Sequence, residues 1–267
     1  MTPEDRAYVP AEALGIMTAR TLDNSHPTLL GLLARGMSVL DVGSGPGTLT
    51  MEIARRVSPG HVVGMDVNAE MVHAAEAASP PGEIPNLVFY AADIRDSSWD
   101  GEFDLVNAAR MLQWLPDPER AVVRMARAAV PDGRVVLRDY DHTLAEWRDE
   151  PVEWKRFYAA FLRWRADGGL DNAIATRLVA LAESAGLVDL EVTPQVATVR
   201  TGSPDFFRAA GMWRMVIDSR GRQMVAAGAL SEAERRAALD AYTEWMQMPN
   251  ATYTSHESCL VARREPS

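Results

Sequence analysis

Apolar residues follow two alternating spacings in the first half of the chain. Short apolar runs, such as the one from Val62 to Met65, are typical of strands buried on both faces. Between them, apolar residues recur every three to four positions, as from Thr48 to Val57, which predicts amphipathic helices. The predicted strands are 38–42, 62–66, 87–91, 103–107 and 134–140, and the predicted helices are 48–57, 69–78 and about 118–129. This alternation predicts an α/β fold with a parallel sheet between two layers of helices.

The alternation stops after residue 142, and helical spacing then dominates. Ser231 and Glu234 have the spacing of a capping box and open one of these predicted helices. In chain order the predicted elements are helices 151–164 and about 172–185, strand 188–200, helices about 204–227 and 231–246, and strand 252–263. Helical spacing also predicts an N-terminal helical segment before residue 38.

Composition and charge narrow the class of protein. The chain has 267 residues, of which 47% are hydrophobic, so it can bury a large core and is not a disordered chain. Its 37 acidic residues outnumber 27 basic ones, which argues against a general nucleic-acid binder. Without a membrane-length apolar stretch or a visible signal peptide, we expect a cytoplasmic protein with no membrane partner. Cys259 is the single cysteine, and no Cys/His cluster suggests a metal site.

The strongest chemical signal is the glycine turn Gly43-Ser44-Gly45-Pro46-Gly47 after the first predicted strand. Glycines at such a turn permit positive φ and bring the backbone close to a ligand. A dinucleotide fingerprint requires its third glycine at the position of Thr48. Asp41, two residues before the turn, would repel a pyrophosphate but would attract a cation. The turn therefore favours a cationic ligand over a dinucleotide.

Two further carboxylates follow strand ends at the same edge of the predicted sheet. Asp66 ends the second strand, where a carboxylate can accept both hydroxyls of a ribose. Asp93 follows the third strand, within reach of an adenine amino group. Together with Asp41 they predict a positively charged, adenosine-containing ligand without phosphate. S-adenosylmethionine (SAM) meets that description.

At these residues the sequence resembles the class I SAM-dependent methyltransferases, especially the small-molecule group related to ubiquinone- and menaquinone-biosynthesis methyltransferases. The resemblance covers about 38–142 and includes Val39–Gly47, Asp66, Ala92-Asp93-Ile94, Phe103–Val106, Leu112–Asp117 and Pro131-Asp-Gly133. It implies a Rossmann-like, seven-stranded, mostly parallel sheet whose last strand is antiparallel, with helical insertions forming a lid over the substrate site. It divides the chain into an N-terminal helical segment (1–38), a SAM-binding core (39–142), a helical lid insertion (143–186) and a C-terminal completion of the sheet (187–267) with a helical insertion at about 204–227.

The resemblance also implies where SAM would lie. Asp41 would sit near the methionine ammonium group, and an N-terminal residue would close over the cofactor. The methionine end and nearby ribose are expected to contact Gly43, Ser44, Gly45 and the backbone of Asn107 and Ala108, with Tyr8 and Arg20 as the candidates for closure. The adenosine end is expected to contact Asp66, Val67, Met71, Asp93 and Ile94.

Candidates for the acceptor side are fewer. His142 follows the fifth strand and could act as a general base, although a helix cap or a satisfied polar residue is the simpler explanation. Trp154, Tyr158 and Trp213 lie in the insertions and could form a substrate wall, although their spacing also fits buried helix faces. Gln113-Trp114 departs from the His-His or His-Trp pair common in related enzymes. Asp139 and Asp141 alone are too few to indicate a metal.

We therefore expect a SAM-dependent methyltransferase acting on a small molecule, with an aromatic, polyketide-like or alkaloid-like secondary metabolite as the acceptor. Exposed aromatic faces of the insertions could form a homodimer interface as easily as a substrate site, so the oligomeric state stays open. The sequence does not indicate which atom of the acceptor, O, N or C, is methylated. One alternative is a SAM-binding cyclase that uses the sulfonium as a fixed charge without transferring the methyl group. A nicotinamide-dependent oxidoreductase is the other alternative, and both Thr48 and Asp41 count against it.

Overall fold

The computed structural model describes residue 18, residues 20–79 and residues 82–266. In this part of the chain an eight-stranded sheet has the order β3-β2-β1-β4-β5-β8, with β6 and β7 both paired to β8. Strands β1 to β5 are parallel, and β8 is antiparallel to its three neighbours. The strands are β1 Val39–Val42, β2 Val62–Asp66, β3 Leu87–Ala91, β4 Phe103–Ala109, β5 Ala129–Tyr140, β6 Glu146–Arg148, β7 Leu187–Arg200 and β8 Thr252–Arg264. The mostly parallel sheet with an antiparallel last strand is confirmed.

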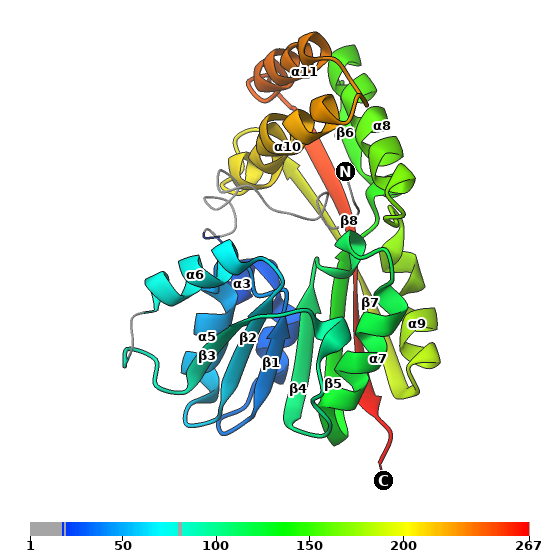
Figure 1. The fold of residues 1–267 in the computed structure, drawn as a ribbon. Coiled ribbons are helices and arrows are strands. Elements are labelled where there is room, and N and C mark those ends of the chain that lie inside the picture. The colour runs from blue at the N-terminus through cyan, green and yellow to red at the C-terminus, as the bar shows by residue number, and fades with distance from the viewer. Residues whose placement is uncertain (1–17, 19, 80–81, 267) are drawn as a thin grey trace.

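Helices flank the parallel part of the sheet, and further helices from the second half of the chain lie beyond one end of it (Figure 1). They are α3 Leu22–Ser25, α4 Pro27–Leu32, α5 Thr48–Val57, α6 Ala69–Ala78, α7 Pro118–Ala128, α8 Val152–Asp167, α9 Ile174–Ser184, α10 Phe206–Ala226 and α11 Glu232–Trp245, with short 3-10 turns η2 Ile94–Asp96, η3 Leu112–Trp114 and η4 His142–Leu144. The predictions for α5 and α6 are confirmed to the residue. None of the helices in the described ranges is long and apolar enough to cross a bilayer.

Three differences from the predicted elements have local causes. Strand β6 raises the number of strands above the predicted seven, because three residues are too few to show a strand period. Strand β5 begins before the predicted residue 134, since Phe103 already pairs with Ala129 across an irregularity. The described part of the predicted N-terminal helix is broken into α3 and α4, where Pro27 starts a new helix and His26 caps it.

The central strands β1, β2 and β4 are buried on both faces, which explains their largely apolar sequences, whereas the outer strands β3 and β7 are mostly exposed. On one face Leu40 and Val42 pack in a cluster with residues of α7 and α9. On the other face Val39 packs in a cluster with residues of α3, α4 and α5. Asp41 lies on this second face and is nevertheless buried, so it needs hydrogen-bonding partners there.

A separate aromatic cluster lies beyond the carboxyl ends of the parallel strands (Figure 1). We call it the aromatic cap: α8, α10, α11, β6 and Tyr253 of β8. Helix α9 does not belong to it, because Ile174 and Leu178 pack in the core of the sheet. The predicted lid segment 143–186 is thus divided between the cap and the sheet, and its role as a lid stays a prediction.

Candidate active site

The glycine turn after β1 is built for close backbone approach. Gly43 and Gly45 have φ of 75° and 53°. A Cβ atom at Gly43 would lie 2.7 Å from the Cγ of Met111, so a larger residue cannot fit without a shift. The Ser44 hydroxyl is buried and has no hydrogen-bond partner in the described part of the chain. A ligand that lies against this turn could supply the missing partner, which is what the predicted SAM site requires.

Asp41 is fixed by a chain of buried polar groups. Thr50 donates from Oγ1 to Oδ2 of Asp41 at 2.6 Å, and Asn107 donates from Nδ2 to Oδ1 at 2.7 Å. The Oδ1 of Asn107 in turn lies 3.1 Å from Nε2 of His26. Burial raises the pKa of Asp41, and these hydrogen bonds oppose that rise. His26, which the sequence pattern did not single out, therefore helps to orient the predicted cofactor carboxylate through Asn107.

A pocket opens beside Asp41, between the glycine turn and the end of β4. It unites five of the predicted cofactor residues with others that were not predicted. The lining residues are Arg20, Asp41, Gly43, Ser44, Pro46, Thr48, Leu49, Asn107, Ala109 and Arg110. Arg110 belongs to no motif, so the sequence analysis did not indicate it. The one signal that could have pointed to it is its position directly after β4. Tyr8 lies outside the described residues, and Ala108 is 1% exposed and does not line this pocket, so its contact with SAM stays a prediction.

Asp66 closes the turn from the neighbouring strand. Its Oδ2 accepts a hydrogen bond from the Gly45 N–H at 2.8 Å, and its Oδ1 accepts one from Asn68 at 2.9 Å. Burial raises the pKa of Asp66, and these two backbone bonds oppose the rise. Val67 is 65% exposed, whereas Met71 is 1% exposed within α6. The carboxylate is thus held beside the turn, and its ribose contact stays a prediction.

Asp93 is paired with a neighbouring cation. Arg95 donates from Nη2 to Oδ2 of Asp93 at 2.7 Å and from Nε to both carboxylate oxygens at 3.0–3.1 Å. Burial raises the pKa of Asp93, but the bonds from Arg95 outweigh it and leave the pKa below its usual value. Ile94 is buried in the following turn. An adenine amino group would have to share the Asp93 carboxylate with Arg95. The contact between Asp93 and adenine stays a prediction.

His142 is buried between the sheet and the aromatic cap. Its Nε2 lies 2.7 Å from Oε1 of Gln113, and its backbone carbonyl accepts a hydrogen bond from the Tyr158 hydroxyl at 2.6 Å. Because Oε1 can only accept, Nε2 carries the proton and Nδ1 carries the lone pair. Burial lowers the pKa of His142 well below its usual value, so the ring is neutral. Gln113, the departure from the usual pair, is thus the partner of the predicted base.

The predicted substrate wall is tightly packed. Trp154 is 0% exposed and Trp213 is 2% exposed, and their ring centroids are 5.7 Å apart. Tyr158 is half-buried, with its ring centroid 5.2 Å from that of Trp213. The spacing of these residues therefore marks buried faces of α8 and α10, as the simpler interpretation had it. A contact with substrate stays a prediction.

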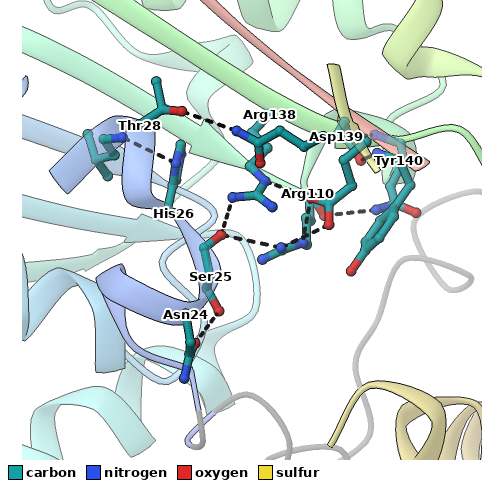
Figure 2. A network of polar contacts seen from close by, with 12 residues as sticks. Asn24, Ser25, His26, Thr28, Arg110, Arg138, Asp139 and Tyr140 are labelled. Carbon is teal, nitrogen blue, oxygen red and sulfur yellow. Dashed lines mark hydrogen bonds and ion pairs between the residues drawn. The ribbon is translucent and has the colours of Figure 1, made fainter. Parts of the chain in front are cut away.

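Figure 2 shows a second network, in which arginines gather at the ends of β4 and β5. Arg110 donates from Nε and Nη2 to Glu257, each at 3.1 Å, and Arg138 donates from Nε to the same carboxylate at 2.7 Å. Both arginines also donate to the carbonyl oxygen of Ser25 (Figure 2). We call Arg20, Arg110, Arg138 and Glu257 the arginine cluster, because Arg20 also interacts electrostatically with these three groups.

Asp139 follows Arg138 on β5 and bonds Gln113, which is the partner of His142. Its Oδ2 accepts from the Gln113 N–H at 3.1 Å, and its Oδ1 accepts from the Tyr140 N–H at 2.9 Å. Burial raises the pKa of Asp139 to about 7, against these hydrogen bonds. Within the described ranges, no group of three or more His, Cys, Asp or Glu side chains could hold a metal ion.

Comparisons with known proteins agree with this geometry. A family model described as a methyltransferase domain matches residues 33–183. The chain is 33% identical over 211 residues to a trans-aconitate 2-methyltransferase of Methylobacterium radiotolerans, covering 76% of this chain and 75% of the relative. It is 30% identical over 126 residues to a ubiquinone/menaquinone biosynthesis C-methyltransferase of Idiomarina loihiensis, covering 46% of this chain and 50% of the relative.

The fold has solved relatives as well. Haemonchus contortus phosphoethanolamine N-methyltransferase 2, in complex with S-adenosyl-L-methionine, matches with a TM-score of 0.58 at 16% identity, covering 90% of this chain and 52% of that one. The Rossmann-like sheet is the fold that this chain shares with that structure. The chain belongs to the methyltransferase-domain family and is a SAM-dependent methyltransferase. These matches do not favour the cyclase alternative.

Proposed function

We propose that this small-molecule methyltransferase acts on a flat, largely apolar acceptor of the aromatic, polyketide-like or alkaloid-like kind, in the cytoplasm. The observation that carries the proposal is the pocket that unites the glycine turn, Asp41 and Asn107 at the edge of the sheet facing the aromatic cap. An acceptor placed between β4, β5 and the cap would meet the half-buried ring of Tyr158 on one side and the cofactor on the other. A homodimer and the lid role of the cap are part of the same proposal.

The residues present fit SAM. Asp41 would face the ammonium group, Arg20 the carboxylate of the methionine moiety, and the unpartnered hydroxyl of Ser44 would gain a hydrogen bond. Asp66 would accept the ribose hydroxyls, and the exposed side chain of Val67 would cover the adenine. When bound, SAM supplies an electrophilic methyl group on a sulfonium. The protein's part is to align the acceptor with it and to exclude water.

His142 would act on the acceptor rather than on SAM. Gln113 and Tyr158 hold the ring and its backbone, so Nδ1 is left as the nitrogen that can accept a proton. The lowered pKa makes this a weak base, which suits an acceptor that is already nucleophilic or acidic. Positioning therefore carries more of the rate than proton transfer in this proposal.

Substitution of Asp66 tests the cofactor site. Asp66→Ala removes the carboxylate proposed for the ribose and is expected to raise the Kd for SAM at least about tenfold, as loss of hydrogen bonds to a charged group should. Isothermal calorimetry with SAM measures this. The matched control is Asp96→Ala, which removes an exposed carboxylate paired with Arg120 and should leave the Kd unchanged. Unchanged SAM affinity in Asp66→Ala would show that the site is assigned wrongly.

Product analysis separates methyl transfer from cyclisation. A methyltransferase releases one S-adenosylhomocysteine (SAH) for each product, whereas a cyclase that uses the sulfonium as a fixed charge releases none. Mass spectrometry of the nucleoside fraction after turnover decides between them. We expect stoichiometric SAH.

A further inference from the structure

Buried positive charge is in excess at the edge of the sheet where an acceptor would approach SAM. The arginine cluster contains three guanidinium groups and one carboxylate. The side chains of Arg110, Arg138 and Glu257 are only 10%, 8% and 7% exposed. Burying charge without a counter-charge is unfavourable, so this excess calls for an anion.

Glu257 has no further capacity to neutralise the cluster. Its Oε1 accepts from Arg110, and its Oε2 accepts from both Arg110 and Arg138. The remaining shared partner, the carbonyl of Ser25, is neutral (Figure 2). Asp139 also attracts Arg110, but its pKa of about 7 means that it carries only part of a charge at neutral pH.

Arg110 is held in a conformation that a side-chain-bearing residue rarely adopts. Its φ is 59°, in the left-handed region, and its N–H donates to the Arg138 carbonyl at 2.6 Å. Backbone strain of this kind is retained mainly where it serves a site. The hydrogen bonds of Arg110 use Nε and Nη2, and Nη1 donates to no atom of the described residues. The side chain of Arg110 therefore lines the pocket with both N–H groups of Nη1 unbonded to the described residues.

Two anions could meet this cluster: the methionine carboxylate of SAM and a group on the acceptor. One carboxylate from SAM, placed at Arg20, leaves Arg110 and Arg138 with only Glu257 and the partly protonated Asp139 as counter-charges. The centroid of the Tyr140 ring lies 5.3 Å from Cζ of Arg110. The same ring stacks on His142, with the two ring centroids 5.4 Å apart. The Arg110 side chain thus lines the cofactor pocket and also contacts the ring of Tyr140, which stacks on the predicted base.

We propose that the methyl acceptor carries a carboxylate, which binds Arg110 at the end of β4. The inference rests on the proposed function, since it assumes a small acceptor beside SAM. A planar carboxylate matches the fork of a guanidinium, and a second guanidinium from Arg138 adds to the attraction. An aromatic or polyketide-like acid would satisfy both the arginine cluster and the aromatic cap.

The test is binding of matched acids and neutral analogues to the full chain saturated with SAH, so that the cofactor's own carboxylate position is filled. The probes are benzoate with benzamide, and trans-aconitate with its trimethyl ester. We expect at least one acid to bind about tenfold or more tightly than its neutral analogue, which corresponds to about one charge-assisted hydrogen bond. Equal affinity of acids and neutral analogues, or no binding of either acid, overturns the inference.

Variants of Arg110 test whether this residue causes the preference for acids over neutral analogues. Arg110→Gln should reduce the preference for the acid to about twofold or less, while Arg110→Lys, which keeps the charge, should retain part of it. Arg177→Gln is the control, because it removes a surface guanidinium that pairs with Glu119 and Asp171. A preference that survives unchanged in Arg110→Gln contradicts the proposal. Should Arg110→Gln fail to fold, the retained preference in Arg110→Lys and its decline with added salt decide the matter.

A cofactor arm separates the two possible anions. SAM and decarboxylated SAM are titrated into the parent, Arg20→Gln and Arg110→Gln. We expect Arg20→Gln to weaken the binding of SAM about tenfold without weakening that of decarboxylated SAM, and Arg110→Gln, at a residue that lines the same pocket, to change both affinities by the same factor. If Arg110→Gln weakens SAM selectively, the cluster serves the cofactor and the acceptor inference fails. If the parent does not bind SAM at all, the proposed function fails instead.

Discussion

The cofactor half of the sheet and the aromatic cap are organised by different interactions. Around the glycine turn, each carboxylate is fixed by named donors, as Asp41 is by Thr50 and Asn107. In the cap, large rings pack on one another, and the indole N–H of Trp154 has no hydrogen-bond partner in the described ranges. The first region is specific because polar groups are oriented, and the second is stable because apolar surface is buried. Changes in the two regions should therefore affect different measurements.

Removal of a cap ring should give the largest loss of stability. Trp154→Ala is expected to lower the free energy of unfolding by about 3–5 kcal/mol, because it leaves a cavity in a fully buried cluster. SAM affinity should stay within about twofold, since the Asp41 site lies in another packing group. Urea unfolding and calorimetry measure the two effects. Phe207→Ala, at an exposed ring, is the control and should change stability by less than about 0.5 kcal/mol.

A smaller effect is expected at the boundary between the regions, and it depends on pH. The pKa of Asp139 is about 7 in the folded protein, above the unfolded value near 3.9. The folded state thus holds the proton more tightly, and the resulting stability is complete below the unfolded pKa and is lost as pH rises toward 7.

Asp139→Asn removes this titration. Between pH 5 and 7 the parent should lose about 2 kcal/mol of stability relative to the variant, as measured by urea unfolding across the range. Asp96→Asn, at an exposed carboxylate, should follow the parent's pH profile. Parallel pH profiles for Asp139→Asn and the parent would contradict the assigned pKa.

The smallest effect in free energy, about 1.4 kcal/mol, should appear in cofactor affinity. Asn107→Ala leaves one oxygen of Asp41 without its donor and is expected to weaken SAM about tenfold. Asn86→Ala is the matched control, because Asn86 donates to the carbonyls of Ala54 and Gly60 away from the pocket. It should cost stability without changing the Kd for SAM. Equal changes of the Kd for SAM in both variants would mean that the hydrogen bonds linking His26, Asn107 and Asp41 only support the fold.

The same comparison explains what the sequence could predict. Helices α5 and α6 and the strand ends at Asp41, Asp66 and Asp93 were predictable, because apolar spacing and glycine turns are local signals. Strand β6 was missed because its pairing with β8 is decided by residues about a hundred positions away. The aromatic spacing of α8 was visible, but the pattern alone could not tell a buried face from a substrate wall.

The missed site residues share one property. His26 and Arg110 belong to no motif, and each acquires its role from a partner distant in sequence or from the pocket it lines. Arg110 meets Glu257 across 147 positions, which no local pattern records. Tertiary contacts of this kind are the part of the site that sequence reasoning does not reach.

The most direct test of the central claim is a crystal structure of the protein with SAH. We expect the ribose hydroxyls within about 2.5–3.2 Å of the Asp66 carboxylate and the methionine ammonium beside Asp41, over the turn at Gly43. The sulfur should face the space between β4, β5 and the aromatic cap. A nucleoside bound elsewhere, or a sulfur pointing away from the cap, would contradict the assignment of this pocket as the methyl-transfer site.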